Sequence, residues 1–173
     1  MNKSRKIIII VAMIFCIFWM GFIFFNSSNN GKTSNNKSHW VLRSIKTKYR
    51  EINIGKYINN IFKGSLKDKV EDKIKKGDNA NVYLRKAAHV FEYFALSLII
   101  TLILFLLKLK ILDRMVYSLF ICLLYAVFDE FHQYFVGGRS SSVLDVIIDF
   151  SGAIIGAALT NIIIVVINFV KNK

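Results

Sequence analysis

Four long apolar stretches, separated by polar segments, dominate the pattern along the chain. They cover Ile7–Phe25, Ala87–Leu107, Val116–Val136 and Val143–Val170. Apolar runs of about twenty residues are long enough to cross the hydrocarbon core of a bilayer as a helix. The pattern therefore predicts an all-α membrane protein, a bundle of four transmembrane helices.

The first stretch follows a basic start formed by Lys3, Arg5 and Lys6. Cleavable signal peptides and retained signal anchors share such a start. The apolar run is longer than the roughly 7–15 residues of a signal-peptide core, and no small-x-small cleavage site follows Phe25. We therefore expect residues 1–25 to form a retained transmembrane anchor.

A long basic segment, residues 26–84, joins the first and second spans. Its first part, Asn26–Asn36, consists mainly of Ser, Asn, Gly and Lys and predicts a flexible tether. From Ser38 onward, apolar residues recur every three or four positions with lysines between them, which predicts a basic amphipathic helical segment. Such a segment either lies on the membrane surface or packs over the mouth of the bundle. Residues 85–173 would then form a three-span core.

Composition narrows the class of partner. Of 173 residues, 54% are hydrophobic, and the formal net charge is +13. Most of this charge lies in one segment of a membrane protein, so it favours membrane lipids or an anionic wall polymer, and we expect no nucleic-acid partner. Cys16 and Cys122 both lie within spans without metal-type spacing, and we interpret them as small apolar fillers.

The short connections predict the orientation. Lys and Arg residues occur at the N-terminus, between the second and third spans (Lys108, Lys110 and Arg114) and at the C-terminus. Short basic segments stay in the cytoplasm, whereas long segments cross the membrane largely regardless of charge. We therefore predict a multi-pass protein of the cell membrane with both termini cytoplasmic and residues 26–84 extracytoplasmic.

Ionisable residues within the spans concentrate at one end of the bundle. They are Arg85, Lys86, His89 and Glu92 at the start of the second span, Asp129, Glu130, His132 with Gln133 and Arg139 at the end of the third, and Asp145 and Asp149 at the start of the fourth. Because successive spans are antiparallel, these positions meet at one mouth. A charge at the bilayer centre costs about 2.5–3.5 kcal/mol on insertion scales, so such residues usually have a partner or a task. The pattern predicts an outward-facing site.

Catalysis is one hypothesis for this site. A histidine would act as general base, with a neighbouring carboxylate orienting it or acting as acid, and the arginines would hold a phosphate or carboxylate of a lipid-linked cell-wall intermediate. The candidate catalytic residues are His89, Glu92, Asp129, Glu130 and His132. The candidate substrate-binding residues are Arg85, Lys86, Gln133, Arg139, Asp145 and Asp149.

Other hypotheses use the same residues differently. A metal version takes His89, Glu92, Asp129 and His132 as ligands, with His89-x-x-Glu92 placing two of them on one helix face. No Glu-x-x-His motif accompanies it, so we assign no metal ligands and leave the cofactor open. A binding version retains an anionic lipid, a wall precursor or a glycopeptide without turnover. A structural version pairs Arg85 with Glu92 and Arg139 with Asp145 to fix the helix register. Proton transport is disfavoured because the other halves of the spans carry almost no ionisable residues.

The motifs, taken together, resemble the VanZ-like family of small bacterial multi-pass membrane proteins. They are Arg85-Lys-x-x-His89-x-x-Glu92-Tyr93, Asp129-Glu130-x-His132-Gln133 with Gly138-Arg139, and Asp145-x-x-x-Asp149-x-x-Gly152-x-x-x-Gly156. The resemblance implies a role in the cell envelope and in susceptibility to the glycopeptide teicoplanin, without supplying a reaction. Gly137 stands where the family usually has proline, and Asp149 where asparagine is often seen.

Overall fold

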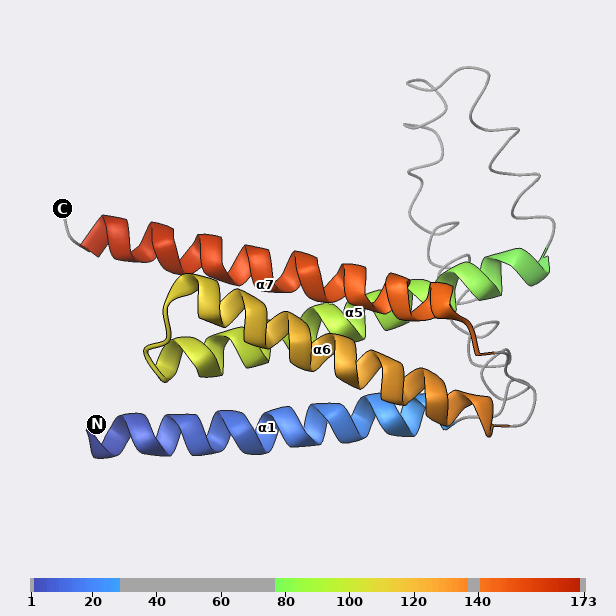
Figure 1. Cartoon of the computed structure of the whole chain (residues 1–173), viewed down its shortest axis with the longest axis horizontal. Coiled ribbons are helices and arrows are strands. Elements are labelled where there is room, and N and C mark those ends of the chain that lie inside the picture. Colours follow the sequence, from blue (N-terminus) through green and yellow to red (C-terminus); the bar gives the residue numbers. More distant parts are fainter. Residues whose placement is uncertain (1, 29–76, 137–140, 172–173) are drawn as a thin grey trace, which may run out of the picture. The chain divides into compact units, whose positions relative to one another are not determined.

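The structure, a computed structural model, describes residues 2–28, 77–136 and 141–171. These residues form four helices and no strand: α1 (Lys3–Ser27), α5 (Gly77–Leu106), α6 (Ile111–Tyr134) and α7 (Val143–Lys171) (Figure 1). Each helix contains a stretch that is long and apolar enough to cross a membrane. The predicted all-α fold with four membrane-spanning helices is confirmed.

The chain divides into two compact units. Residues 1–29 and 88–173 form the first, and residues 30–87 form the second. Most of the predicted tether and amphipathic segment belongs to the second unit and lies outside the described residues. α5 begins at Gly77, well before the predicted start of its span at Ala87. The description below concerns the first unit.

Within the first unit, the helices have two distinct ends. α1 and α6 finish, and α7 begins, at what we call the polar end, while both chain termini and the turn between α5 and α6 lie at what we call the terminal end (Figure 1). Large apolar side chains cover the outside of the helices; Ile17, Phe131 and Val143 are 69%, 64% and 77% exposed. Apolar surface of this extent on every helix suits contact with lipid.

Small residues bring α7 against the backbone of α5. A Cβ atom added at Gly152 would collide with the carbonyl of Val90, and one added at Gly156 would collide with Phe94 and Ser97. Helices in membranes often associate through such small residues, because the backbones can then approach closely. The predicted role of these two glycines is confirmed.

The centre of the first unit is apolar and includes residues from each helix. Its buried members are Ile23, Tyr93, Leu96, Ile100, Cys122, Ala126 and Ala153, and Cys16 and Trp19 are among the residues packed against them. Both cysteines are free thiols. Their packing agrees with the interpretation as apolar fillers.

Candidate functional site

Three helices each place one titratable side chain at a common point near the polar end. His89 comes from α5, Asp129 from α6 and Asp149 from α7, and one ligand atom of each lies within 4.8 Å of the others. Asp129 and Asp149 are only 3% and 2% exposed, and His89 is largely buried. The three side chains therefore meet inside the bundle.

The close contact between α5 and α7 explains this meeting. Gly152, whose hydrogen faces the Val90 carbonyl, lies three residues after Asp149, so both are on one face of α7. Val90 directly follows His89. The contact that needs glycine on α7 therefore also fixes Asp149 beside His89.

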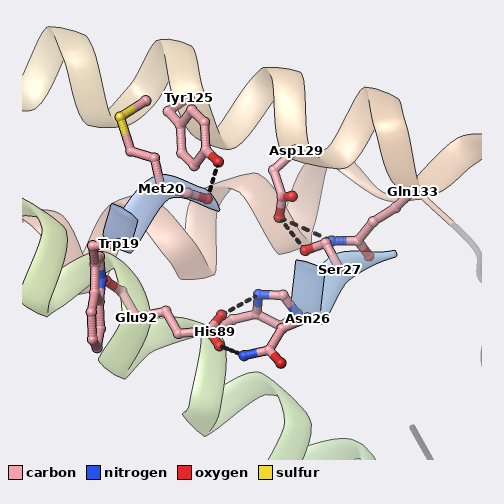
Figure 2. Close-up of polar contacts among 9 residues, drawn as sticks. All are labelled: Trp19, Met20, Asn26, Ser27, His89, Glu92, Tyr125, Asp129 and Gln133. Atoms are coloured by element: carbon pink, nitrogen blue, oxygen red, sulfur yellow. Dashed lines mark hydrogen bonds and ion pairs between the residues drawn. The ribbon is translucent and has the colours of Figure 1, made fainter. Parts of the chain in front are cut away.

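Glu92 joins this group from the next turn of α5. Its Oε2 atom lies 3.4 Å from Nδ1 of His89, and its Oε1 atom accepts a hydrogen bond of 2.7 Å from Nδ2 of Asn26 (Figure 2). The indole Nε1 of Trp19 donates to the Glu92 backbone carbonyl at 3.0 Å. α1 thus holds both the side chain and the backbone of Glu92.

Asp129 is held in a similar way. Its Oδ2 atom accepts a hydrogen bond of 2.7 Å from Ser27 Oγ and another of 3.2 Å from Gln133 Nε2 (Figure 2). The same Gln133 nitrogen lies 3.4 Å from Ser27 Oγ, which it also approaches as a donor. In this arrangement Gln133, which we expected to bind substrate, orients Asp129.

The structure does not gather all five candidate catalytic residues at one point. Glu130 Oε1 accepts a hydrogen bond of 2.7 Å from the backbone N–H of Ser142, just before α7 begins. His132 lies against the end of α1: its Nε2 atom is 3.0 Å from Ser28 Oγ, and its ring centroid is 4.3 Å from that of Phe24. Only His89, Glu92 and Asp129 meet as expected.

The remaining predicted residues occupy different places. Arg85 and Lys86 lie on the part of α5 that belongs to the second unit, and Arg139 lies outside the described residues. Asp145 lies in the first turn of α7, where the positive end of the helix dipole stabilises a carboxylate. Asp149, expected to bind substrate, joins the central group instead.

Sequence reasoning missed the contribution of α1. We expected Asn26 to begin a flexible tether, but α1 continues to Ser27 because Asn26 and Ser27 find carboxylate partners on α5 and α6. A signal was present: Trp19, Ile23 and Asn26 follow the i, i+4, i+7 spacing of one helix face. An anchor that only contacts lipid has no need of such a face.

The donor set can perform two kinds of chemistry. An imidazole with a carboxylate near one ring nitrogen can act as a general base through the other. An imidazole nitrogen with two carboxylate oxygens is also a donor set for a divalent metal. The expected metal-binding alternative included Glu92 and His132, whereas the converging ligand atoms belong to His89, Asp129 and Asp149.

Comparison with protein families gives one match. The family described as VanZ/LLP1 matches residues 12–165, a stretch that includes all three converging residues. The match is wider than the stretch from Tyr83 to Leu159 in which the sequence motifs lie, and it takes in most of α1. No curated protein and no solved structure matches the chain.

Proposed function

This chain belongs to the VanZ/LLP1 family, and we propose that it acts in the bacterial cell envelope through the group of His, Asp and Glu residues at its polar end. The site would bind or act on a lipid-linked or other anionic envelope substrate, such as a cell-wall precursor. Through that substrate the protein would lower susceptibility to the glycopeptide teicoplanin. The polar end would face outward, with both termini in the cytoplasm.

The convergence of three helices on one buried acidic and imidazole group carries this proposal. Asp129 and Asp149 are almost fully buried, and they come from separate helices. Burying a carboxylate is costly unless it is hydrogen-bonded, paired or bound to a metal. We take two such carboxylates that meet a histidine as the centre of a reactive site.

Catalysis would begin at His89. With Glu92 facing Nδ1, the ring would use Nε2 to take the proton of a water or hydroxyl group as that oxygen attacks a substrate phosphorus or carbonyl carbon. The bond from that atom to its leaving oxygen would break, and the imidazolium would return the proton to the leaving oxygen. Glu92 would stabilise the resulting imidazolium, held in place by Asn26. Arg85, Lys86 and Arg139 remain the candidates for binding the anionic part of the substrate.

A structural function for the same residues is the competing hypothesis, and specific contacts favour it. Asn26 with Glu92, Ser27 with Asp129, and the Ser142 backbone with Glu130 each join residues far apart in the chain. Intramembrane hydrogen bonds between helices stabilise a bundle by about 0.6 kcal/mol on average. On this hypothesis the loss of a carboxylate lowers the amount of folded protein together with any activity.

Teicoplanin susceptibility separates these possibilities. A sensitive Gram-positive host would express the wild type, His89→Gln, or Ser118→Ala, a control in the other half of the bundle. We expect the wild type and Ser118→Ala to raise the inhibitory concentration, and His89→Gln to return it to that of the empty host at equal membrane abundance. Loss of abundance along with protection would favour the structural function. A wild type that gives no protection would refute the teicoplanin role.

A further inference from the structure

The converging group has the composition and size of a metal-binding site. One nitrogen ligand atom and two carboxylate oxygens, no more than 4.8 Å apart, lie within about 2.8 Å of a common centre. Bonds from zinc to imidazole nitrogen and carboxylate oxygen are about 2.0–2.2 Å. Small side-chain adjustments toward that centre would therefore complete a coordination sphere.

Asp149 provides an independent reason to expect a cation. Its side chain is 2% exposed, and among the residues that the structure describes, none forms a hydrogen bond or an ion pair with it. Its carboxylate nevertheless points at His89 and Asp129. A buried carboxylate in this position needs a positive partner at the point where the three side chains meet.

The described cations of the first unit do not supply that partner. They are Lys3, Arg5, Lys6, Lys108, Lys110, Arg114 and Lys171, which lie at the starts or ends of helices on the side of the terminal end. In the described part of this unit, the polar end therefore has no Lys or Arg side chain; Arg85 and Lys86 lie on the same helix as His89 but belong to the second unit.

The surroundings of the three ligands also resemble those of a metal site. Metal-bound imidazoles usually donate their other N–H group to a carboxylate. Glu92 Oε2 lies 3.4 Å from Nδ1 of His89, an ion-pair distance that a small rotation of either side chain would shorten to a hydrogen bond. Ligating carboxylates are themselves hydrogen-bonded, as Asp129 is by Ser27 and Gln133. Glu92 would leave Nε2 of His89 as the nitrogen that binds the ion.

We infer that His89, Asp129 and Asp149 bind one divalent transition-metal ion of the zinc type. Calcium and magnesium prefer all-oxygen sites, whereas an imidazole nitrogen favours zinc and its neighbours in the first transition row. Three protein ligands leave at least one coordination position open for water or a substrate oxygen, as in catalytic zinc sites. The inference goes beyond the proposed function and replaces its general base: with Nε2 bound to the ion, His89 would be a ligand, and the ion would lower the pKa of the attacking water. Its test needs no known substrate.

Direct metal analysis tests this inference. The full-length protein, carrying a tag without histidine, would be purified in detergent, stripped with EDTA, incubated with zinc chloride, desalted and analysed by mass spectrometry for zinc. We expect about one zinc per wild-type chain, and loss of most of it in His89→Gln and in Asp149→Asn. Two controls should keep it: His132→Gln, a histidine outside the group, and Asp113→Asn, an exposed carboxylate on α6.

Absence of stoichiometric zinc in the wild type would overturn the inference, as would retention by Asp149→Asn or equal loss in His132→Gln. If the ligand variants fail to accumulate, X-ray absorption spectroscopy of the zinc-loaded wild type identifies the ligand atoms around the zinc. One imidazole with oxygen ligands supports the site, and two imidazoles or any sulfur ligand refute it. Because no step measures susceptibility, a failed metal site and a failed envelope role give separate results.

Discussion

The two halves of the bundle satisfy their buried polar groups in different ways. At the polar end, buried side chains bond across helices: Asn26 to Glu92, Ser27 to Asp129, and Glu130 to the backbone of Ser142. Toward the terminal end, most of the buried hydroxyls and amides bond to the backbone of their own helix, although Asn161 on α7 also donates to Met115 Sδ on α6 at 3.1 Å. The bonds within one helix are Ser97 to Phe94, Ser118 to Met115, Thr160 to Gly156 and Asn161 to Ala157.

This difference distinguishes side chains that belong to a site from side chains that only pack within the bundle. A hydroxyl bonded to its own helix satisfies itself wherever that helix lies, and it requires little of its neighbours. A carboxylate held from another helix depends on the positions of both helices. The hydrogen bonds at the polar end therefore depend more strongly on how the helices are placed than most of those in the terminal half.

The two ends also differ in how their charged side chains are stabilised. The Arg5 guanidinium donates to the backbone carbonyl of Leu106, the last residue of α5. The negative end of the helix dipole stabilises a positive charge at this position. Arg114, which we expected in a connecting loop, lies within α6, is 6% exposed and stacks over Phe105 with 5.3 Å between guanidinium carbon and ring centroid. The terminal end thus stabilises its cations through a helix carbonyl and an aromatic ring, whereas the polar end brings carboxylates together.

We expect the largest effect in a labelling experiment that tests whether the two ends face opposite sides of the membrane. A cysteine in place of Ser141, at the polar end, should react with a membrane-impermeant maleimide in intact cells, and one in place of Lys110 should react only after the membrane is opened. The parent protein gives the background, since Cys16 and Cys122 lie within spans. The reverse labelling pattern would place the candidate site in the cytoplasm and contradict the envelope role.

We expect the second largest effect from a substitution that pushes α5 and α7 apart. Gly152→Ala forces its new methyl group against the Val90 carbonyl, and overpacking of this kind costs about 1–3 kcal/mol. We expect a lower midpoint of thermal unfolding in detergent. Gly21→Ala is the matched control because no atom lies within 4 Å of the added carbon, and it should cause no loss. Equal effects of the two changes would show that the contact is not close in solution.

We expect the smallest effect, a difference in the free energy of unfolding, when two serine substitutions are compared. Ser27→Ala removes a hydrogen bond to the buried Asp129 carboxylate and should cost about 1 kcal/mol. Ser118→Ala removes only a bond to its own helix, leaves no partner on another helix unsatisfied, and should cost less than Ser27→Ala. Thermal unfolding of the two variants side by side measures the difference. A larger cost for Ser118→Ala would contradict the contrast between the two halves.

Much of the fold was predictable because the signals are local. Apolar runs of membrane-spanning length identified each helix, although α5 begins earlier than expected and α1 extends through Asn26 to Ser27. The small residues of α7 correctly indicated a close helix contact. The end of the bundle at which His89, Asp129 and Asp149 lie was predictable too, since it follows from their positions within antiparallel spans.

The sequence by itself determined which residues share a helix and which end of the bundle they reach. Helical periodicity relates side chains only within one helix, and the rotation of each helix about its own axis depends on its neighbours. Only the tertiary structure decided that Asp149 joins His89 and Asp129, that His132 turns to Phe24, and that α1 contributes Asn26 and Ser27. The physical reason is the packing of backbone against backbone at Gly152, which fixes that rotation for α7.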